Sequence, residues 1–232
     1  MAVPSLVQTK TSAANVGSTS LTAAFTNNVK EGNLIVVGTG VDTTGAAAIT
    51  APTDTLGNTY TQIFNSAFAT NRGAAYYAYS IKSGANTVTG HYDGSNSEQS
   101  LIVREYWGVP ISVVPLDTSN SATGTSNAPN STATTATGAS YRLVIGFVMD
   151  DNGAGQTYAS SGYSNLTSIT SNSGDGVAMV DKTIGTPSTE TAAFTLGTSA
   201  GWVCAVATFL PSGGSFRIIG SRPAPFKPGI AL

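Results

Sequence analysis

The sequence predicts an all-β protein of the sandwich type, and three observations support this prediction. The chain of 232 residues consists largely of short runs rich in Val, Ile, Thr, Tyr and Phe, separated by clusters of Gly, Asn, Asp and Ser. Such runs are typical of β-strands. No stretch of ten or more residues shows helical periodicity. Several runs also recur in the same order in the two halves of the chain. Chains with many short strands form sandwiches or barrels, which hide the sheet faces and limit open edges.

The recurring segments indicate that the chain is duplicated. NLIVVGTGVDTTGAA (33–47) aligns without a gap with YRLVIGFVMDDNGAG (141–155). The later segments 57–63, 73–81 and 100–107 match 162–169, 176–184 and 203–210 in the same order. Two related halves, about 18–107 and 126–210, are therefore expected. This alignment pairs Gly38 with Gly146.

The alignment predicts that Leu34–Val41 and Leu143–Met149 occupy equivalent places in the fold. It also predicts that Gly38 and Gly146 share one structural role, such as a bulge or a close approach between sheets.

Each recurring segment predicts a particular kind of strand. LIVVG (34–38) and LVIGFVM (143–149) are almost continuously apolar, which is typical of central strands covered on both faces. YYAYSI (76–81) and TVTGHY (87–92) alternate, as half-buried strands do. The low-complexity connection 117–138 contains one short candidate strand, near 132–137. In all, about twelve to fourteen strands are expected.

Two architectures fit this pattern. In the first, which we favour, the halves interleave over residues 1–211 into one two-sheet jelly roll of the concanavalin/laminin-G kind. In the second, each half closes as its own immunoglobulin-sized sandwich. The long central strands and the thin connection between the halves favour the first. The expected core comprises Leu34, Val36, Ile63, Tyr77, Val103, Val144, Ile145, Val180, Val206 and Phe209.

The composition excludes several classes of function. Charged residues make up 9% of the chain and its formal net charge is −2, so no broad basic surface exists for nucleic acid or an anionic membrane. No apolar run approaches the ~20 residues of a membrane span, and MAVPSLVQTK lacks the pattern of a signal peptide. We therefore expect the protein to fold in a reducing cytosol. The single cysteine, Cys204, predicts a buried and inert thiol without a disulfide partner.

Few residues could carry catalysis. His91 is the only histidine, and no G-x-S-x-G motif accompanies it, so we expect a strand histidine that faces solvent or a hydrogen-bond partner. Glu105 is the best candidate for an inward-facing acid, but glycosidases need two carboxylates on opposite sides of the sugar, and no second one follows the expected pattern. We expect Arg104 and Glu105 to lie at a strand edge or subunit contact. We predict no enzymatic activity and no cofactor.

One acidic turn could bind calcium. Asp150, Asp151 and Asn152 precede Gly153, and carboxylates on a flexible turn are ligands that calcium favours. The equivalent turn after Asp42 has threonines in place of the second acid and the amide. A turn in which an Asp side chain caps its own backbone explains the pattern equally well, so no metal site is predicted.

Aromatic residues are concentrated in the first half and could form a platform for sugars. The alternative is that they pack in the core and in cross-strand pairs, and we favour this alternative. The residues concerned are Tyr60, Tyr76, Tyr77, Tyr79, Tyr92, Tyr106 and Trp107, with Trp202 in the second half.

The C-terminal sixteen residues, RIIGSRPAPFKPGIAL, differ from the rest of the chain. Prolines prevent this stretch from continuing a helix or a central strand, while it also contains several apolar residues and three basic ones. We predict that residues 212–232 form an extended arm that lies along another subunit; the alternative is an arm folded back over its own sandwich. The predicted partner-binding residues are Phe216, Arg217, Arg222, Pro225, Phe226, Lys227 and Ile230.

The sequence resembles a group of known proteins at two places. The pattern GNLIVV…DTLGNTYTQIF…AAYYAYSIKSGANTVTG…SLIVREYWGV, within residues 18–210, resembles a β-sandwich module of bacteriophage structural proteins and some bacterial surface proteins. The ending RPAPFKPGIAL is similar to short C-terminal tails of phage virion proteins.

These resemblances imply a non-enzymatic virion component: a head decoration protein, a head fibre or a minor tail protein. Its partners would be capsid or tail protein and further copies of itself. It would be made in the host cytoplasm and released by lysis. The alternative function is that of a carbohydrate-binding module that attaches to a surface glycan.

Overall fold

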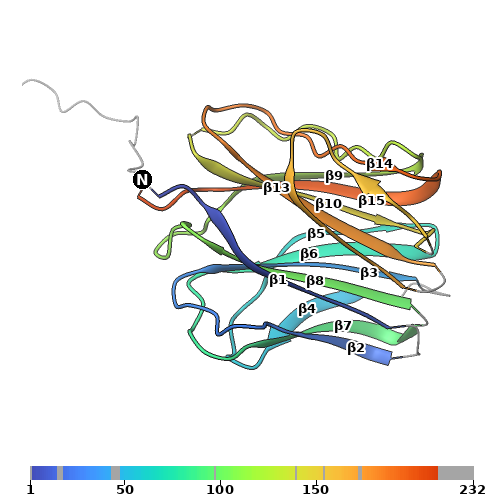
Figure 1. Ribbon diagram of the computed structural model, residues 1–232, viewed down its shortest axis with the longest axis horizontal. Coiled ribbons are helices and arrows are strands. Elements are labelled where there is room, and N and C mark those ends of the chain that lie inside the picture. The colour runs from blue at the N-terminus through green and yellow to red at the C-terminus, as the bar shows by residue number, and fades with distance from the viewer. Residues whose placement is uncertain are drawn as a thin grey trace, which may run out of the picture.

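The computed structural model describes residues 2–14, 18–42, 48–96, 98–138, 140–153, 155–171 and 174–213. These residues form fifteen strands and no helix, which confirms the predicted all-β class (Figure 1). All the strand pairs described are antiparallel.

Two five-stranded sheets form the centre of the molecule. The first large sheet contains, in spatial order, β1 (Ser5–Ala14), β8 (Glu98–Trp107), β3 (Leu34–Asp42), β6 (Asn71–Ala78) and β5 (Thr61–Phe68). The second contains β12 (Ser164–Thr170), β13 (Gly176–Ile184), β10 (Arg142–Asp150), β15 (Ala200–Phe209) and β9 (Leu116–Ser126).

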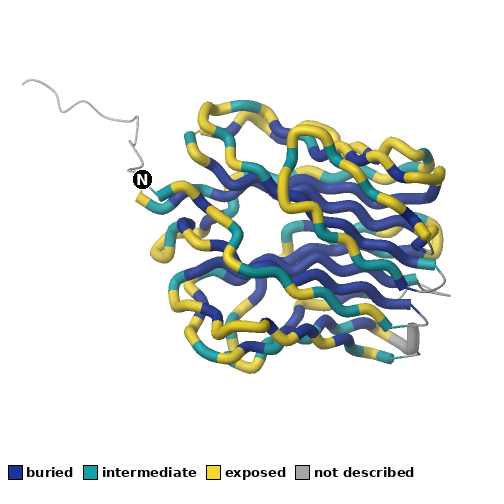
Figure 2. Tube along the Cα trace, in the orientation of Figure 1, coloured by how far each residue is buried: buried dark blue, intermediate teal, exposed yellow. Residues whose placement is uncertain are grey.

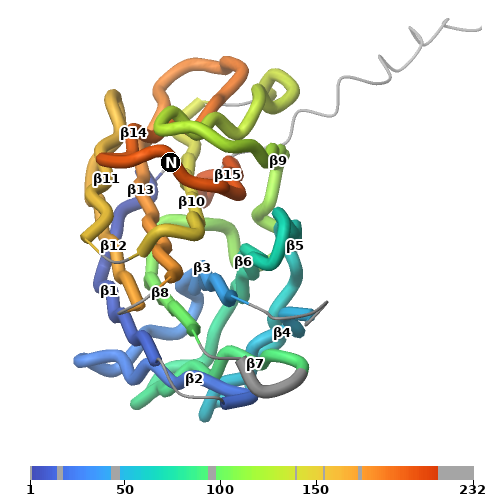
Figure 3. Tube along the Cα trace, turned by 90° about the vertical axis from the view of Figure 1, so that its right-hand side faces the viewer, coloured from blue at the N-terminus to red at the C-terminus, as the bar shows by residue number. Residues whose placement is uncertain are grey.

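Smaller sheets cover the outer faces of the two large sheets. The outer sheet of the first half contains β2 (Ser18–Ala24), β7 (Thr87–Asn96) and β4 (Ile49–Asp54). The outer sheet of the second half contains β11 (Tyr158–Ala159) and β14 (Thr195–Leu196). Figure 3 shows the resulting layers, with β2 and β7 at the bottom and β14 at the top. The two large sheets face each other between these outer layers.

Strand burial follows from this layering. All described residues of β10 and β15 are buried because each strand is covered on both faces, as their almost continuous apolar sequences predict. The edge strands β1 and β9 instead carry Ser, Thr and Asn and alternate between exposed and half-buried positions. Figure 2 shows this contrast as dark blue central strands and paler edges.

The two halves of the chain have the same sheet topology. The spatial order β1-β8-β3-β6-β5 corresponds strand by strand to β9-β15-β10-β13-β12. Strands β3 and β10 each lie in the middle of a large sheet, so their predicted equivalence is confirmed. The duplicated unit also includes β1 and β9, which the sequence comparison left out.

The predicted equivalence of Gly38 and Gly146 is wrong. A Cβ at Gly38 would lie 2.7 Å from Sδ of Met179, in the core between the halves. A Cβ at Gly146 would lie 2.9 Å from Cβ of Ala192, in the outer layer of the second half. Because side chains alternate along a strand, a one-residue error in alignment exchanges the two faces. Pairing Leu34 with Leu143 instead places both residues in the shared core.

The sheets combine features of the two predicted architectures. No described sheet contains strands from both halves, so the halves do not interleave into a two-sheet jelly roll. Each half builds its own pair of layers, as in the second alternative. The two halves nevertheless share one core. Residues 131–137 are not a strand, but they form backbone hydrogen bonds with 188–192 and extend the outer layer of the second half.

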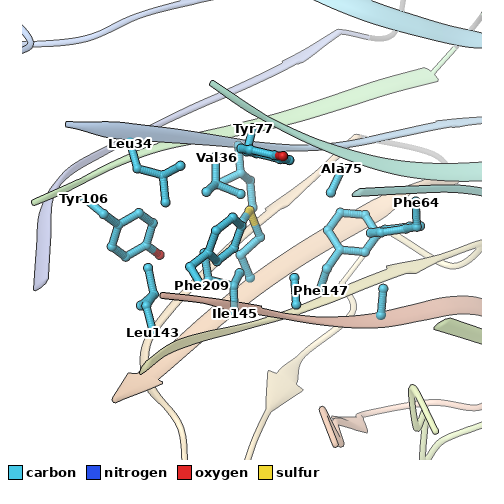
Figure 4. Packing of buried hydrophobic residues seen from close by; sticks show 14 of the residues in the cluster. Leu34, Val36, Phe64, Ala75, Tyr77, Tyr106, Leu143, Ile145, Phe147 and Phe209 are labelled. Atoms are coloured by element: carbon cyan, nitrogen blue, oxygen red, sulfur yellow. The ribbon is translucent and has the colours of Figure 1, made fainter. Parts of the chain in front are cut away.

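The shared core fills the space between the two large sheets. Phe64 and Phe147 face each other across this boundary with ring centroids 5.0 Å apart, and the rings of Tyr77 and Phe209 are 5.6 Å apart (Figure 4). The predicted core is confirmed: nine of the ten residues named above are buried, and Ile63 packs partly buried against the shared core. Cys204 is buried in the outer core of the second half, as expected.

Candidate functional site

The predicted partner-binding residues lie outside the described residues. They are Phe216, Arg217, Arg222, Pro225, Phe226, Lys227 and Ile230, whereas the described chain ends at Gly213. The surface around Gly213, where the described chain ends, is formed by described residues. It is the best candidate for a functional site because it combines a hollow, exposed apolar side chains and both ends of the described chain.

The hollow has a volume of about 380 Å³ and lies beside the loop between β8 and β9. We call it the terminal hollow. In Figure 1 this loop lies at the left-hand end of the molecule, close to the N-terminus. The hollow is lined by Glu31, Gly32, Asn33, residues 107–112, Ser212 and Gly213.

Close backbone packing fixes the loop that forms one wall of the terminal hollow. Gly108 has a φ of 90° and lies so near the N-terminal segment that a Cβ would be 3.0 Å from Cα of Pro4. The N–H of Ser212 donates to the carbonyl oxygen of Gly108 at 2.7 Å, and the N–H of Ala2 donates to that of Ser212 at 3.3 Å. The described end of the chain is therefore held between β8 and the N-terminus.

Several large apolar side chains around the terminal hollow are exposed. Trp107 is 53% exposed and Ile111 is 60% exposed, although a neighbouring loop residue, Val109, is buried. Val113 and Val114, in the same loop, and Val3, beside Gly108, are also exposed. A local concentration of exposed apolar groups marks an interaction surface more often than singly scattered ones do. The sequence signal for this surface is the apolar run GVPISVVPL (108–116).

Glu105 supports the other wall of the hollow. Its Oε1 accepts hydrogen bonds from Nδ2 of Asn33 at 2.6 Å and from the backbone N–H of Lys30 at 2.9 Å. Its Oε2 accepts one from Nε2 of Gln8 at 2.7 Å. The carboxylate is buried, and through these hydrogen bonds it holds the loop before β3 against β1 and β8. Glu105 therefore has a structural role in the described fold.

Arg104 connects the two halves of the molecule. Its Nη1 lies 3.2 Å from Oδ2 of Asp181, and its Nη2 donates to the carbonyl oxygen of Met179 at 2.8 Å. The hydroxyl of Tyr106 donates to the same Asp181 oxygen at 3.0 Å. Because β8 is an inner strand and Arg104 and Glu105 are both buried, the expectation that they lie at a strand edge or subunit contact is wrong.

His91 and Asp150 occupy the structural roles that the sequence favoured. Nε2 of His91 lies 2.8 Å from the hydroxyl oxygen of Thr53 on the neighbouring strand β4. Oδ1 of Asp150 accepts the backbone N–H of Asn152 at 3.0 Å, which is the predicted capping of its own turn. Within the described residues, no three His, Cys, Asp or Glu side chains are placed to hold a metal ion together.

Four acidic residues, which the sequence did not identify as a group, lie where the halves meet. Burial, followed by the negative charges of Asp42, Glu98 and Asp150, raises the pKa of Asp175 to about 9. Asp42 and Glu98 belong to the first half, whereas Asp150 and Asp175 belong to the second. Only the contact between the halves brings these four side chains together.

Most of the aromatic residues considered for a sugar platform are in the core. Tyr60, Tyr76, Tyr77, Tyr92, Tyr106 and Trp202 are buried and Tyr79 is partly buried, which confirms the packing interpretation for them. Trp107 is the exception, because it is exposed at the terminal hollow.

No family model matches the chain, and comparisons with curated proteins and with solved structures find no match. No helix in the described part of the chain is long and apolar enough to cross a membrane.

Proposed function

We propose that the protein is a non-enzymatic structural component of a bacteriophage particle, which decorates or stabilises capsid or tail through protein–protein contacts. The observation that carries this proposal is the position at which the described chain ends. Gly213 lies among exposed apolar side chains, and the sequence that follows contains apolar residues, three basic residues and three prolines. Such a segment is suited to binding a partner protein.

The chemistry of the arm favours attachment. Proline stiffness reduces the entropy lost when an extended segment is ordered on a partner. A single apolar side chain such as Phe226 entering a pocket would contribute on the order of 2 kcal/mol. Arg222 and Lys227 would pair with carboxylates of the partner and select its orientation. The two halves with their shared core would form the body that the arm attaches to the particle.

An inventory of purified particles tests the proposal. We expect mass spectrometry of particles from the phage that encodes this protein to detect it at a fixed copy number relative to the major capsid or tail protein. The reference is an abundant non-structural protein of the same lysate, which should decrease through purification. Loss of this protein along with the reference would contradict the proposal.

The second candidate function is binding of a surface glycan, and Trp107 is the observation that favours it. An exposed indole ring stacks well on a sugar, and Glu31 and Ser112 line the same hollow and offer polar atoms to hydroxyl groups. A glycan array tests this candidate: binding should be lost in Trp107→Ala and retained in Trp202→Phe, in which the buried tryptophan is replaced. If no glycan on the array bound the intact chain, this candidate function would be wrong.

A further inference from the structure

We propose that residues 216–219 of the same chain dock in the terminal hollow beside Trp107, so that the arm has a fixed root and only residues 222–232 reach a partner. The assignment of 222–232 to a partner rests on the proposed function; the docking of 216–219 does not. Three observations carry the inference: the reach of the chain, the apolar surface of the hollow and the charge at the rim of the hollow. The covalent connection then favours this segment over other occupants.

The reach of the chain is short and directed at the hollow. Ser212 is held by two backbone hydrogen bonds, and Gly213 lines the hollow itself. Phe216 follows three residues later and therefore lies within about 10 Å of Gly213. The intervening Gly214 and Ser215 are small and permit the chain to turn back.

The apolar surfaces match. Phe216, Ile218 and Ile219 are apolar, and the hollow presents the exposed faces of Trp107 and Ile111. An aromatic ring next to an indole ring gains both burial of apolar area and favourable ring contacts. The hollow's volume of about 380 Å³ suits a few side chains rather than a whole folded partner.

The charges match as well. Glu31 is exposed on the rim of the hollow and forms no ion pair with any described residue. Arg217 directly follows Phe216, so a docked phenyl ring carries the guanidinium to the rim where Glu31 lies.

The covalent connection favours the same chain over a second copy. A short flexible tether gives its own segment an effective concentration in the millimolar range. The segment of another copy, or a weakly bound sugar, would have to exceed this concentration to displace it. Past Ile219, Gly220 and Ser221 separate the root from Pro223, where the proline-rich part begins. The docked root would therefore fix the starting point of the projecting part.

Quenching of tryptophan fluorescence by acrylamide tests the docking. Trp202 is only 8% exposed, so the quenchable emission comes mainly from Trp107. We expect the full chain to be several-fold less quenchable than a chain that ends at Gly213. Phe216→Ser should behave like the shortened chain. Phe226→Ser is the matched control, because it changes the same residue type beyond the root, and it should behave like the full chain.

A charge exchange and a dilution series complete the test. Arg217→Glu should raise quenching of Trp107, and adding Glu31→Arg to that variant should lower it again. The protection should be the same at all protein concentrations. Equal quenching of the full and shortened chains would overturn the proposal, as would protection that increases with concentration, which would assign the hollow to a second copy. If docking fails while removal of 222–232 still prevents attachment to particles, the proposed function stands without the root.

Discussion

Arg104 of β8 and Asp181 of β13 form an ion pair across the boundary between the halves, with 3.2 Å between Nη1 and Oδ2. Both side chains are almost completely buried, and burial is the main cause that raises the pKa of Asp181. Tyr106 and Asn165 donate further hydrogen bonds to this carboxylate. This polar network therefore joins the two halves beside their shared apolar core.

Removing one partner of this ion pair should destabilise the fold strongly. Asp181→Ala leaves the buried guanidinium of Arg104 without its counter-charge, so we expect a loss of about 3–5 kcal/mol in the free energy of unfolding. The double variant Arg104→Met/Asp181→Leu removes both charges and should be more stable than the single variant. Denaturant titration measures both. A single variant as stable as the unmodified protein would show that the pair is unimportant.

Asp175 should make stability depend on pH. Its pKa in the folded protein is raised from 3.8 to about 9, so between these values the folded state binds a proton that the unfolded state has released. Stability is then greatest below about pH 4 for this group, and it decreases as pH rises towards 9, by at most about 1.4 kcal/mol per pH unit. Asp175→Asn cannot titrate and should be more stable than the unmodified protein at pH 8.

Denaturant titration at several pH values checks this prediction. Glu31→Gln is the control, because it removes an exposed carboxylate that is not among the charges acting on Asp175, and it should leave the pH profile unchanged. A profile for Asp175→Asn that parallels the unmodified protein between pH 5 and 8 would contradict the assignment.

The close approach of the halves at Gly38 should not tolerate a side chain. Gly38→Ala places a methyl group within 2.9 Å of Cδ2 of Phe147 and closer still to Met179, so side chains of the shared core must move. Such overpacking destabilises by about 1–3 kcal/mol. Gly185→Ala is the matched control, since no atom apart from its own residue and its chain neighbours lies within 4 Å of its added Cβ. Equal stability of the two variants would show that the shared core adapts freely.

The shared core should make the two halves unfold together. Contacts such as Phe64 with Phe147 are lost if either half unfolds, and the exposed face of the remaining large sheet would be apolar. We expect one calorimetric transition for the intact chain and no stable proteolytic fragment that corresponds to one half. Two well-separated transitions would contradict this expectation.

The sequence revealed the strands and their duplication because central strands need apolar residues throughout. It did not reveal β9, whose sequence LDTSNSATGTS is polar because it is an edge strand with an exposed face. The prediction for Gly38 was wrong because two strands that are apolar throughout can be aligned equally well one residue apart. Such a shift exchanges the sheet face on which Gly38 lies. Burial of Arg104 could not be foreseen, since its counter-charge lies 77 positions further along the chain.

The candidate site was foreseen only in part. The composition of the C-terminal arm identified a segment suited to a partner, and Trp107 was recognised as one of a set of aromatic residues. Their proximity depends on the hydrogen bond from Ser212 to Gly108, which joins positions more than 100 residues apart. Asp175 and Glu98 likewise approach each other only through the packing of the two halves.

Attachment of the purified protein to particles tests the central claim most directly. Full-length protein and a chain that ends at Ser221 would each be mixed with phage particles lacking this protein, and the fraction that sediments with the particles would be measured. We expect the full-length protein to sediment and the shortened chain to remain in solution, although their melting temperatures should be nearly equal. Equal sedimentation of the two chains, or none of the full-length protein, would contradict the claim that residues 222–232 attach the protein to the particle.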